Sequence, residues 1–306
     1  MRFQRFAALA CVLAAASFIG CGGNKPGAGD EGDSTATMPK EVRIVKGENG
    51  APFPDAKLQV LMPTPNQVVD KDCVMVKVQL TGVDLGTPTE GEQSKGINFS
   101  KDGQHIHVIV DDKPYMAMYK TDSFSVGKLS EGIHTLRAFP SRSWHESIKT
   151  PGAFVAESFY VKKKTGEPLL KEGAPLLTYS RPKGDYKGKD CDRILLDFYL
   201  SNAELGAGKY GVIASIDGQV KDTLREWVPY FIEGLPDGEH TVKLELIGPD
   251  GKPVPGAFNS AERKIKVARS EQPAPPMAMP HDTSAPHHDS SAPKGDASKP
   301  APKKKP

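Results

Sequence analysis

The chain has few cysteines and few tryptophans, and it lacks a large excess of charge of either sign. Its 306 residues include 4 cysteines and 2 tryptophans, with 40 basic side chains against 38 acidic ones. Cys11 and Cys21 lie near the N-terminus, which leaves only Cys73 and Cys191 further along. Such isolated cysteines exclude a disulfide framework and a Cys-x-x-Cys metal knuckle. The balanced charge argues against a nucleic-acid partner, which would require a basic field.

Catalytic motifs and helical patterns are also missing from the sequence. It contains no Gly-x-Ser-x-Gly, no phosphate-binding loop, no His-Glu-x-x-His and no close carboxylate pair, so we do not expect an enzyme. Apolar stripes at helical spacing are hard to find, whereas glycine (30) and proline (27) are frequent. This composition predicts an all-β protein with many turns.

The N-terminus has the pattern of an export signal. Two arginines precede an apolar stretch at 6–18, which is too short to cross a bilayer as a stable helix. The junction Phe18-Ile19-Gly20-Cys21 resembles the lipobox of bacterial lipoproteins, with phenylalanine where that family usually has leucine. The resemblance implies a signal peptide at 1–20, lipidation of Cys21 and attachment to a membrane of the cell envelope. Gly22 favours the outer membrane over the inner one. The alternative is an ordinary secretory signal with a chance cysteine.

Both ends of the mature chain are predicted to be flexible. Residues 21–40 are rich in glycine, aspartate and threonine and would form a tether. Residues 269–306 contain no isoleucine, leucine, valine or aromatic residue, so this tail has nothing to bury and is predicted to be disordered. Its thioethers and imidazoles suit copper, although in an unstructured and weak site. They are Met277, Met279, His281, His287 and His288.

The middle of the chain contains two related halves. Residues 74–80 and 194–200 both have apolar side chains at alternate positions, as in a strand with one buried face. Further matching pairs follow in the same order, and Pro-Gly-Ala-Phe occurs at both 151–154 and 255–258. A repeat of this length indicates two copies of one structural unit.

Each half has about seven short strands separated by turns, which resembles the immunoglobulin-like sandwiches of tandem bacterial surface modules. The fold class is therefore predicted as all-β, with two tandem immunoglobulin-like β-sandwich domains. The first domain spans 41–163 and the second 176–268, with a linker at 164–175. The resemblance implies a fold and says little about function.

Three features distinguish the first half from the second. The connection between residues 85 and 111 is longer than its counterpart between 205 and 217. In the strand at 105–110, His105 and His107 share the face opposite the inward-facing apolar residues. Ser-Arg-Ser-Trp-His-Glu-Ser at 141–147 replaces a short turn, and it resembles a string in uncharacterised exported bacterial proteins.

These features should converge on one tip of the first domain. In the immunoglobulin-like fold the histidine strand and the strand preceding the tryptophan loop are antiparallel neighbours. We interpret the tip as a non-catalytic binding or scaffolding surface for an envelope protein or glycan, with the second domain as a spacer or docking module. Its contact residues would be Arg142, Trp144 and Glu146, with Arg137 beside His107. This interpretation requires no cofactor.

The alternative is a periplasmic metal site. His105, His107 and His145 could bind copper or zinc, with Glu146 as a further ligand. By contrast, His134 and His240 recur in both halves and are interpreted as framework groups bonded to nearby backbone.

Cys73 and Cys191 occupy matching positions before a strand of each half. A disulfide between them would require the two domains to lie side by side, because bridged Cα atoms lie within about 7 Å of each other. The sequence leaves this pairing open.

Overall fold

The computed structural model describes residues 41–91 and 97–270. Within these residues the fold is all-β, as predicted, with four sheets and one short 3₁₀ helix, η2 (Gly188–Cys191). The predicted signal peptide, Cys21, the tether up to residue 40 and the tail from residue 271 onward lie outside the described residues. No helix in the described part of the chain is long and apolar enough to span a bilayer.

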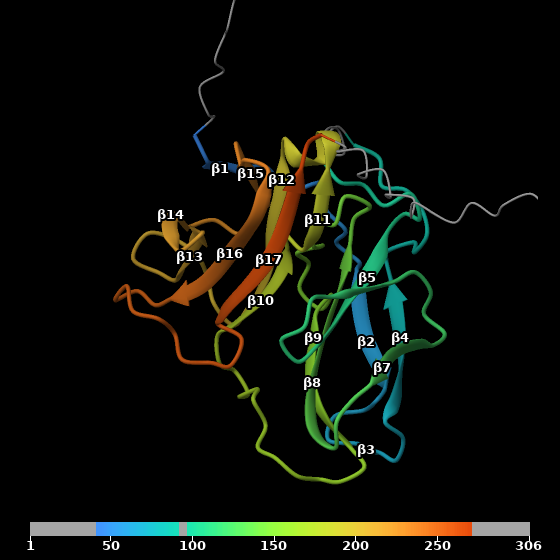
Figure 1. Ribbon diagram of the computed structural model, residues 1–306. Helices are drawn as coiled ribbons and strands as arrows, with labels where there is room; N and C mark the ends of the chain where they lie inside the picture. The colour runs from blue at the N-terminus through green and yellow to red at the C-terminus, as the bar shows by residue number, and fades with distance from the viewer. Residues whose placement is uncertain (1–40, 92–96, 271–306) are drawn as a thin grey trace, which may run out of the picture. The chain divides into compact units, whose positions relative to one another are not determined.

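The first sandwich has one sheet of three strands and one of five (Figure 1). The three-stranded sheet has the order β2 (Lys57–Met62), β4 (Cys73–Thr81) and β7 (Phe124–Lys128). The five-stranded sheet has the order β3 (Val68–Val69), β9 (Val155–Val161), β8 (Gly132–Ser141), β5 (His105–Val110) and β6 (Met116–Met118).

The second sandwich has one sheet of four strands and one of five (Figure 1). The four-stranded sheet has the order β1 (Arg43–Lys46), β15 (Tyr230–Glu233), β12 (Ile194–Ser201) and β10 (Leu176–Arg181). The five-stranded sheet has the order β11 (Gly184–Lys187), β17 (Ser260–Ala268), β16 (Gly238–Ile247), β13 (Gly211–Ile216) and β14 (Gln219–Leu224). The strands of the two five-stranded sheets follow the same order, as expected for two copies of one repeated structural unit.

The predicted alternation along β5 is confirmed. Ile106, Val108 and Val110 belong to the apolar core of the first sandwich. Because successive side chains of a strand point to opposite faces, His105 and His107 lie on the outer face of the same sheet.

The predicted range 41–163 for the first domain needs one correction. Strand β1 pairs with β15 of the second sandwich, and Arg43 lies opposite Glu233. The physical reason is apolar burial, since Val42 and Ile44 pack against the second core. The chain therefore contributes an edge strand to the second sandwich before it builds the first.

The second domain packs directly against the first. The outer face of β5 and β8 contributes Ile109 and Phe139 to an apolar cluster that includes Tyr199 of β12. Strand β12 is buried along nearly its whole length, on both faces of its sheet. This two-sided burial explains why 194–200 is almost continuously apolar.

The two remaining cysteines are free. Cys73 is exposed on β4, and Cys191 is buried in the second core. His134 and His240 are framework groups, as predicted. In each copy one ring nitrogen donates to a backbone carbonyl and the other contacts an aspartate, Asp111 or Asp217.

Candidate metal centre

Three buried histidines converge on the outer face of the first sandwich. Strand β5 supplies His105 and His107, and the loop after β8 supplies His145. His105 Nε2 lies 3.1 Å from His107 Nε2 and 3.1 Å from His145 Nδ1, and the three ligand atoms all lie within 4.8 Å of one another. His105 and His107 are 0% exposed and His145 is 8% exposed. The structure thus brings together the three residues that the sequence predicted as metal ligands.

The pairing of β5 with β8 explains the convergence. His105 lies opposite Ser141, the last residue of β8, so the start of one strand meets the loop that leaves the other. That loop turns back at once, because the His145 backbone N–H donates to the Arg142 carbonyl at 2.9 Å. His145 adopts a left-handed conformation with a φ of 69°, which is unfavourable for a residue with a Cβ atom. Such local strain is typical of functional positions.

Glu146 holds the loop in place. Its Oε2 accepts the indole N–H of Trp144 at 2.7 Å, and its Oε1 accepts the backbone N–H of Gly50 at 3.0 Å. Arg142 completes the arrangement as an ion-pair partner at 3.4 Å. Both carboxylate oxygens therefore accept hydrogen bonds that hold the loop, and Glu146 is not among the clustered ligand atoms of the three histidines. A Cβ atom at Gly50 would lie only 2.5 Å from Arg142 Nε, which explains the glycine there.

The predicted contact residues for an external partner are not exposed. Trp144 is 1%, Arg142 3% and Glu146 1% exposed. Trp144 packs against Leu195 and Phe231 of the second sandwich. The prediction that these side chains form an accessible tip is therefore wrong. The second sandwich covers Trp144, whereas Arg142 contacts Ala51 and Phe53 and Glu146 contacts Gly50.

Arg137 lies diagonal to His107 on the outer face of the sheet and not directly opposite it. It lies opposite Ile109 in the β5–β8 register, whereas the partner of His107 is Phe139. Its guanidinium lies 3.8 Å from the ring centroid of Phe258, and it is 2% exposed. Burial lowers the pKa of Arg137 to about 10. Arg137 therefore belongs to the contact between the sandwiches.

The hydrogen bonds around His105 determine which of its nitrogens carries the proton. His105 Nδ1 lies 2.9 Å from the Gly103 carbonyl, which can only accept, so Nδ1 carries the hydrogen. Gly103 has a φ of 84°, and a Cβ atom there would lie 2.5 Å from the Gly86 backbone. Glycine thus allows the turn that aims this carbonyl at the ring. In the neutral ring, His105 Nε2 is left with a free lone pair.

The same argument applies to His145. Asn98 donates through Nδ2 to Asp190 at 2.9 Å, which leaves its Oδ1 to accept from His145 Nε2 at 3.0 Å. His145 Nδ1 therefore carries no proton when the ring is neutral. The Tyr115 hydroxyl, 3.2 Å away, can donate to it.

Two lone pairs consequently face each other across 3.1 Å, from His105 Nε2 and His145 Nδ1. A cation between them would replace this repulsion with two attractive contacts. Two nitrogens bound at about 2.0 Å to one tetrahedral ion lie about 3.3 Å apart. The observed separation is thus close to that expected for two ligands of one metal ion.

His107 can supply a third lone pair. Its Nδ1 lies 3.1 Å from the hydroxyl of Ser180 on β10, which can either accept or donate. With the proton on Nδ1, His107 donates to Ser180, and the three free nitrogens lie within 4.8 Å of one another. With the proton on Nε2, His107 donates to His105 instead. Ser180 thus accommodates both forms.

Burial keeps the three rings neutral. Desolvation lowers the pKa of His105 to about 4 and holds the pKa values of His107 and His145 well below the ordinary value. The positive charges of Arg181 and Lys183 contribute to each lowering. Neutral imidazole is the form that binds metal ions.

Sequence reasoning missed four residues of the centre: Asn98, Gly103, Tyr115 and Ser180. Asn98 lies in the long connection that was predicted to reach this tip, and Gly103 is a turn residue just before β5. The sequence pattern could therefore have indicated both Asn98 and Gly103. Tyr115 and Ser180 had no sequence signal. The Tyr115 ring stacks on His107 with the ring centroids 3.4 Å apart, and Ser180 belongs to the other sandwich, so both contacts depend on the folded structure.

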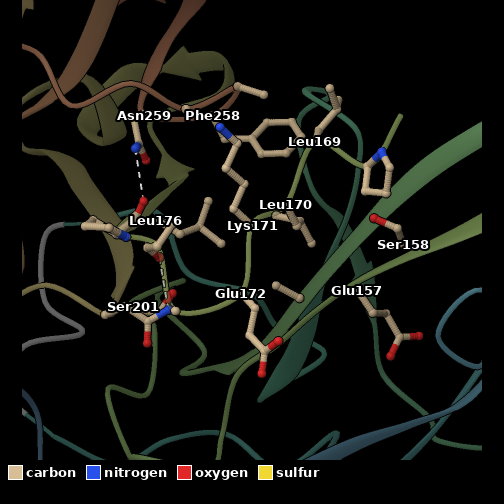
Figure 2. Close-up of a pocket in the computed structure, with 18 of the residues that line it drawn as sticks. Glu157, Ser158, Leu169, Leu170, Lys171, Glu172, Leu176, Ser201, Phe258 and Asn259 are labelled. Carbon is tan, nitrogen blue, oxygen red and sulfur yellow. Dashed lines mark hydrogen bonds between the residues drawn. The ribbon is translucent and has the colours of Figure 1, made fainter. Parts of the chain in front are cut away.

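A cavity of about 890 Å³ lies elsewhere, beside the linker between the two sandwiches. Leu169, Leu170 and Phe258 give it apolar surface (Figure 2). Glu157 of β9 lies at its edge and is 8% exposed, with an Oε1 atom that lacks a hydrogen-bond partner. Burial raises the pKa of Glu157 to about 7.

We expect Glu157→Gln to stabilise the protein at pH 8. The folded pKa of about 7 exceeds the ordinary value of 4.5, so the stability is greatest below pH 4.5 and falls as the pH rises through 7. Glutamine cannot ionise, so it removes this loss. Thermal unfolding should give the variant a higher Tm than wild type at pH 8 and an equal Tm near pH 4.5, while exposed Glu239→Gln changes neither. Equal Tm values at pH 8 would contradict the prediction.

No protein-family model matches the chain, and no curated protein is similar to it. Among solved structures, it is similar to fibronectin(III)-like modules of CbhA from Clostridium thermocellum, at 12% identity over 69% of this chain and 95% of that one, with a TM-score of 0.24. It is also similar to the central fibronectin-III array of RIM-binding protein, at 13% identity over 75% and 76%, with a TM-score of 0.25.

A third similar structure is SGBP-B from Bacteroides ovatus, in complex with a mixed-linkage heptasaccharide. The identity is 10% over 69% of this chain and 70% of that one, with a TM-score of 0.20. Likenesses this low carry no conclusion about ligand or activity. The tandem-sandwich architecture rests on the strand pairing of the chain itself.

Proposed function

We propose that the protein is a lipid-anchored envelope protein whose centre of His105, His107 and His145 binds one copper or zinc ion. The observation that carries the proposal is the pair of unprotonated nitrogens on His105 and His145, held 3.1 Å apart by hydrogen bonds that fix both tautomers. Imidazole suits both metals.

The proposed role at this end of the first sandwich is non-catalytic binding, with a metal ion as the ligand in place of a protein or glycan. The loop at 141–147 positions a histidine instead of presenting a surface to a protein or glycan. Trp144 and Glu146 then act as supports that hold His145 against β5, which fits their burial.

The envelope location in the proposal rests on the lipobox-like junction at Cys21. The membrane would be contacted through the lipid on this residue, and the outer membrane is favoured by Gly22. A metal centre outside the cytoplasm also fits a chain whose free cysteines are not part of the site.

Titration of the purified full-length protein with Cu⁺ and with Zn²⁺, each against a competing chelator, tests the proposal. We expect one tightly bound ion per chain, and loss of that ion in a variant with all three centre histidines changed to alanine. The tail must be controlled, because its side chains could also bind copper. A control variant changes Met277, Met279, His281, His287 and His288 to alanine.

The expected result is full retention of the tight ion in the tail variant. Loss of the ion from the tail variant, with retention in the variant of the centre, would overturn the proposal. So would the absence of tight binding of either metal by the wild-type chain.

A further inference from the structure

The charges around the three histidines distinguish a monovalent ion from a divalent one. The three converging ligands in the described residues are neutral imidazoles, with no carboxylate among them. Two cationic side chains lie nearby, Arg181 and Lys183. Lys183 Nζ lies 3.9 Å from the ring centroid of Tyr115, and that ring stacks on His107 at 3.4 Å. The exposed Asp102 is a weaker opposing influence on His105.

Both burial and the neighbouring cations disfavour a second positive charge on the ion. The cost of moving an ion out of water grows with the square of its charge. Repulsion from Arg181 and Lys183 grows in proportion to that charge. Because no ligand is anionic, a buried divalent ion here would keep its full charge.

The number of ligands points the same way. Zn²⁺ sites normally have four ligands, and Cu²⁺ favours tetragonal arrangements of nitrogen and oxygen. Here three nitrogens converge, and His105 and His107 have no solvent exposure. The Tyr115 ring covers one side of His107. A monovalent copper ion needs no more than three such ligands.

We infer that the centre takes Cu⁺ in preference to Zn²⁺ and Cu²⁺. The inference rests on the proposed function and specifies the ion. It does not require any change in the oxidation state of the bound metal.

Anaerobic competition titrations of the full-length tail variant test the preference directly. We expect the association constant for Cu⁺ to exceed that for Zn²⁺ at least a thousandfold. Equal or tighter binding of Zn²⁺ at the same histidines would overturn the inference while leaving the proposed metal centre intact. Failure of both ions to bind would overturn the proposed function itself.

Lys183→Gln gives a second test of the electrostatic cause. A change that removes one unit of repulsion should strengthen Cu⁺ binding by roughly threefold and Zn²⁺ binding by roughly tenfold, since the effect scales with the charge of the ion. The matched control is Lys187→Gln, an exposed position on β11, which should change neither affinity. Equal gains for both ions, or no gain for either, would contradict the electrostatic basis of the preference.

Discussion

Replacing Lys149 with methionine is expected to lower the free energy of unfolding by about 3–5 kcal/mol. Lys149 Nζ donates to Asp197 Oδ1 at 2.6 Å, and the two side chains are only 7% and 0% exposed. Asp197 also accepts the Ser147 backbone N–H at 3.0 Å. Removal of the lysine leaves a buried carboxylate with one hydrogen bond and without its ion-pair partner. Urea unfolding of the purified protein measures the loss.

Two further variants identify the cause. The double change Lys149→Met with Asp197→Leu removes both charges and should recover most of the lost stability. The exposed pair of Lys46 and Glu226 serves as the matched control, and Lys46→Met should cost less than about 1 kcal/mol. A loss of less than 1 kcal/mol for Lys149→Met would show that Asp197 is not buried between the two sandwiches as described.

The bound ion is expected to stabilise the folded protein by about 2.7 kcal/mol when its free concentration is 100 times the dissociation constant. The increment arises because only the folded chain brings the three nitrogens together. His107→Ala should abolish it, since His107 is wholly buried and supplies one of the three ligands. Thermal unfolding with and without the ion measures the increment.

His134→Gln is the control that separates metal binding from stability. His134 contacts Asp111 and the Ser130 carbonyl, both at 2.9 Å, and lies outside the histidine centre. This variant should be less stable than wild type and still gain the full increment from the ion. An unchanged increment in His107→Ala would exclude His107 as a ligand.

The sequence predicted the local part of the centre well. Period-two alternation placed His105 and His107 on one face, and the antiparallel pairing of neighbouring strands brought the loop with His145 to the same end. These inferences depend on the geometry of a single sandwich, which is largely determined by its own residues.

What depends on the second sandwich could not be predicted in the same way. The burial of Trp144 depends on which face of β12 lies over it, and a repeat pattern does not show how the two sandwiches pack together. One signal was available, because the run at 194–200 is apolar on both faces. It indicates a strand covered on both sides. The role of Ser180 follows only from the packing of β10 against β5.

X-ray absorption spectroscopy of the copper-loaded full-length protein, in the variant that lacks the tail thioethers and histidines, tests the central claim most directly. The account predicts three nitrogen scatterers at about 2.0 Å, with the outer-shell pattern of imidazole and no sulfur. Loss of this spectrum in His105→Ala would complete the assignment. A spectrum with sulfur or only oxygen neighbours, unchanged by His105→Ala, would contradict the existence of a three-histidine metal centre.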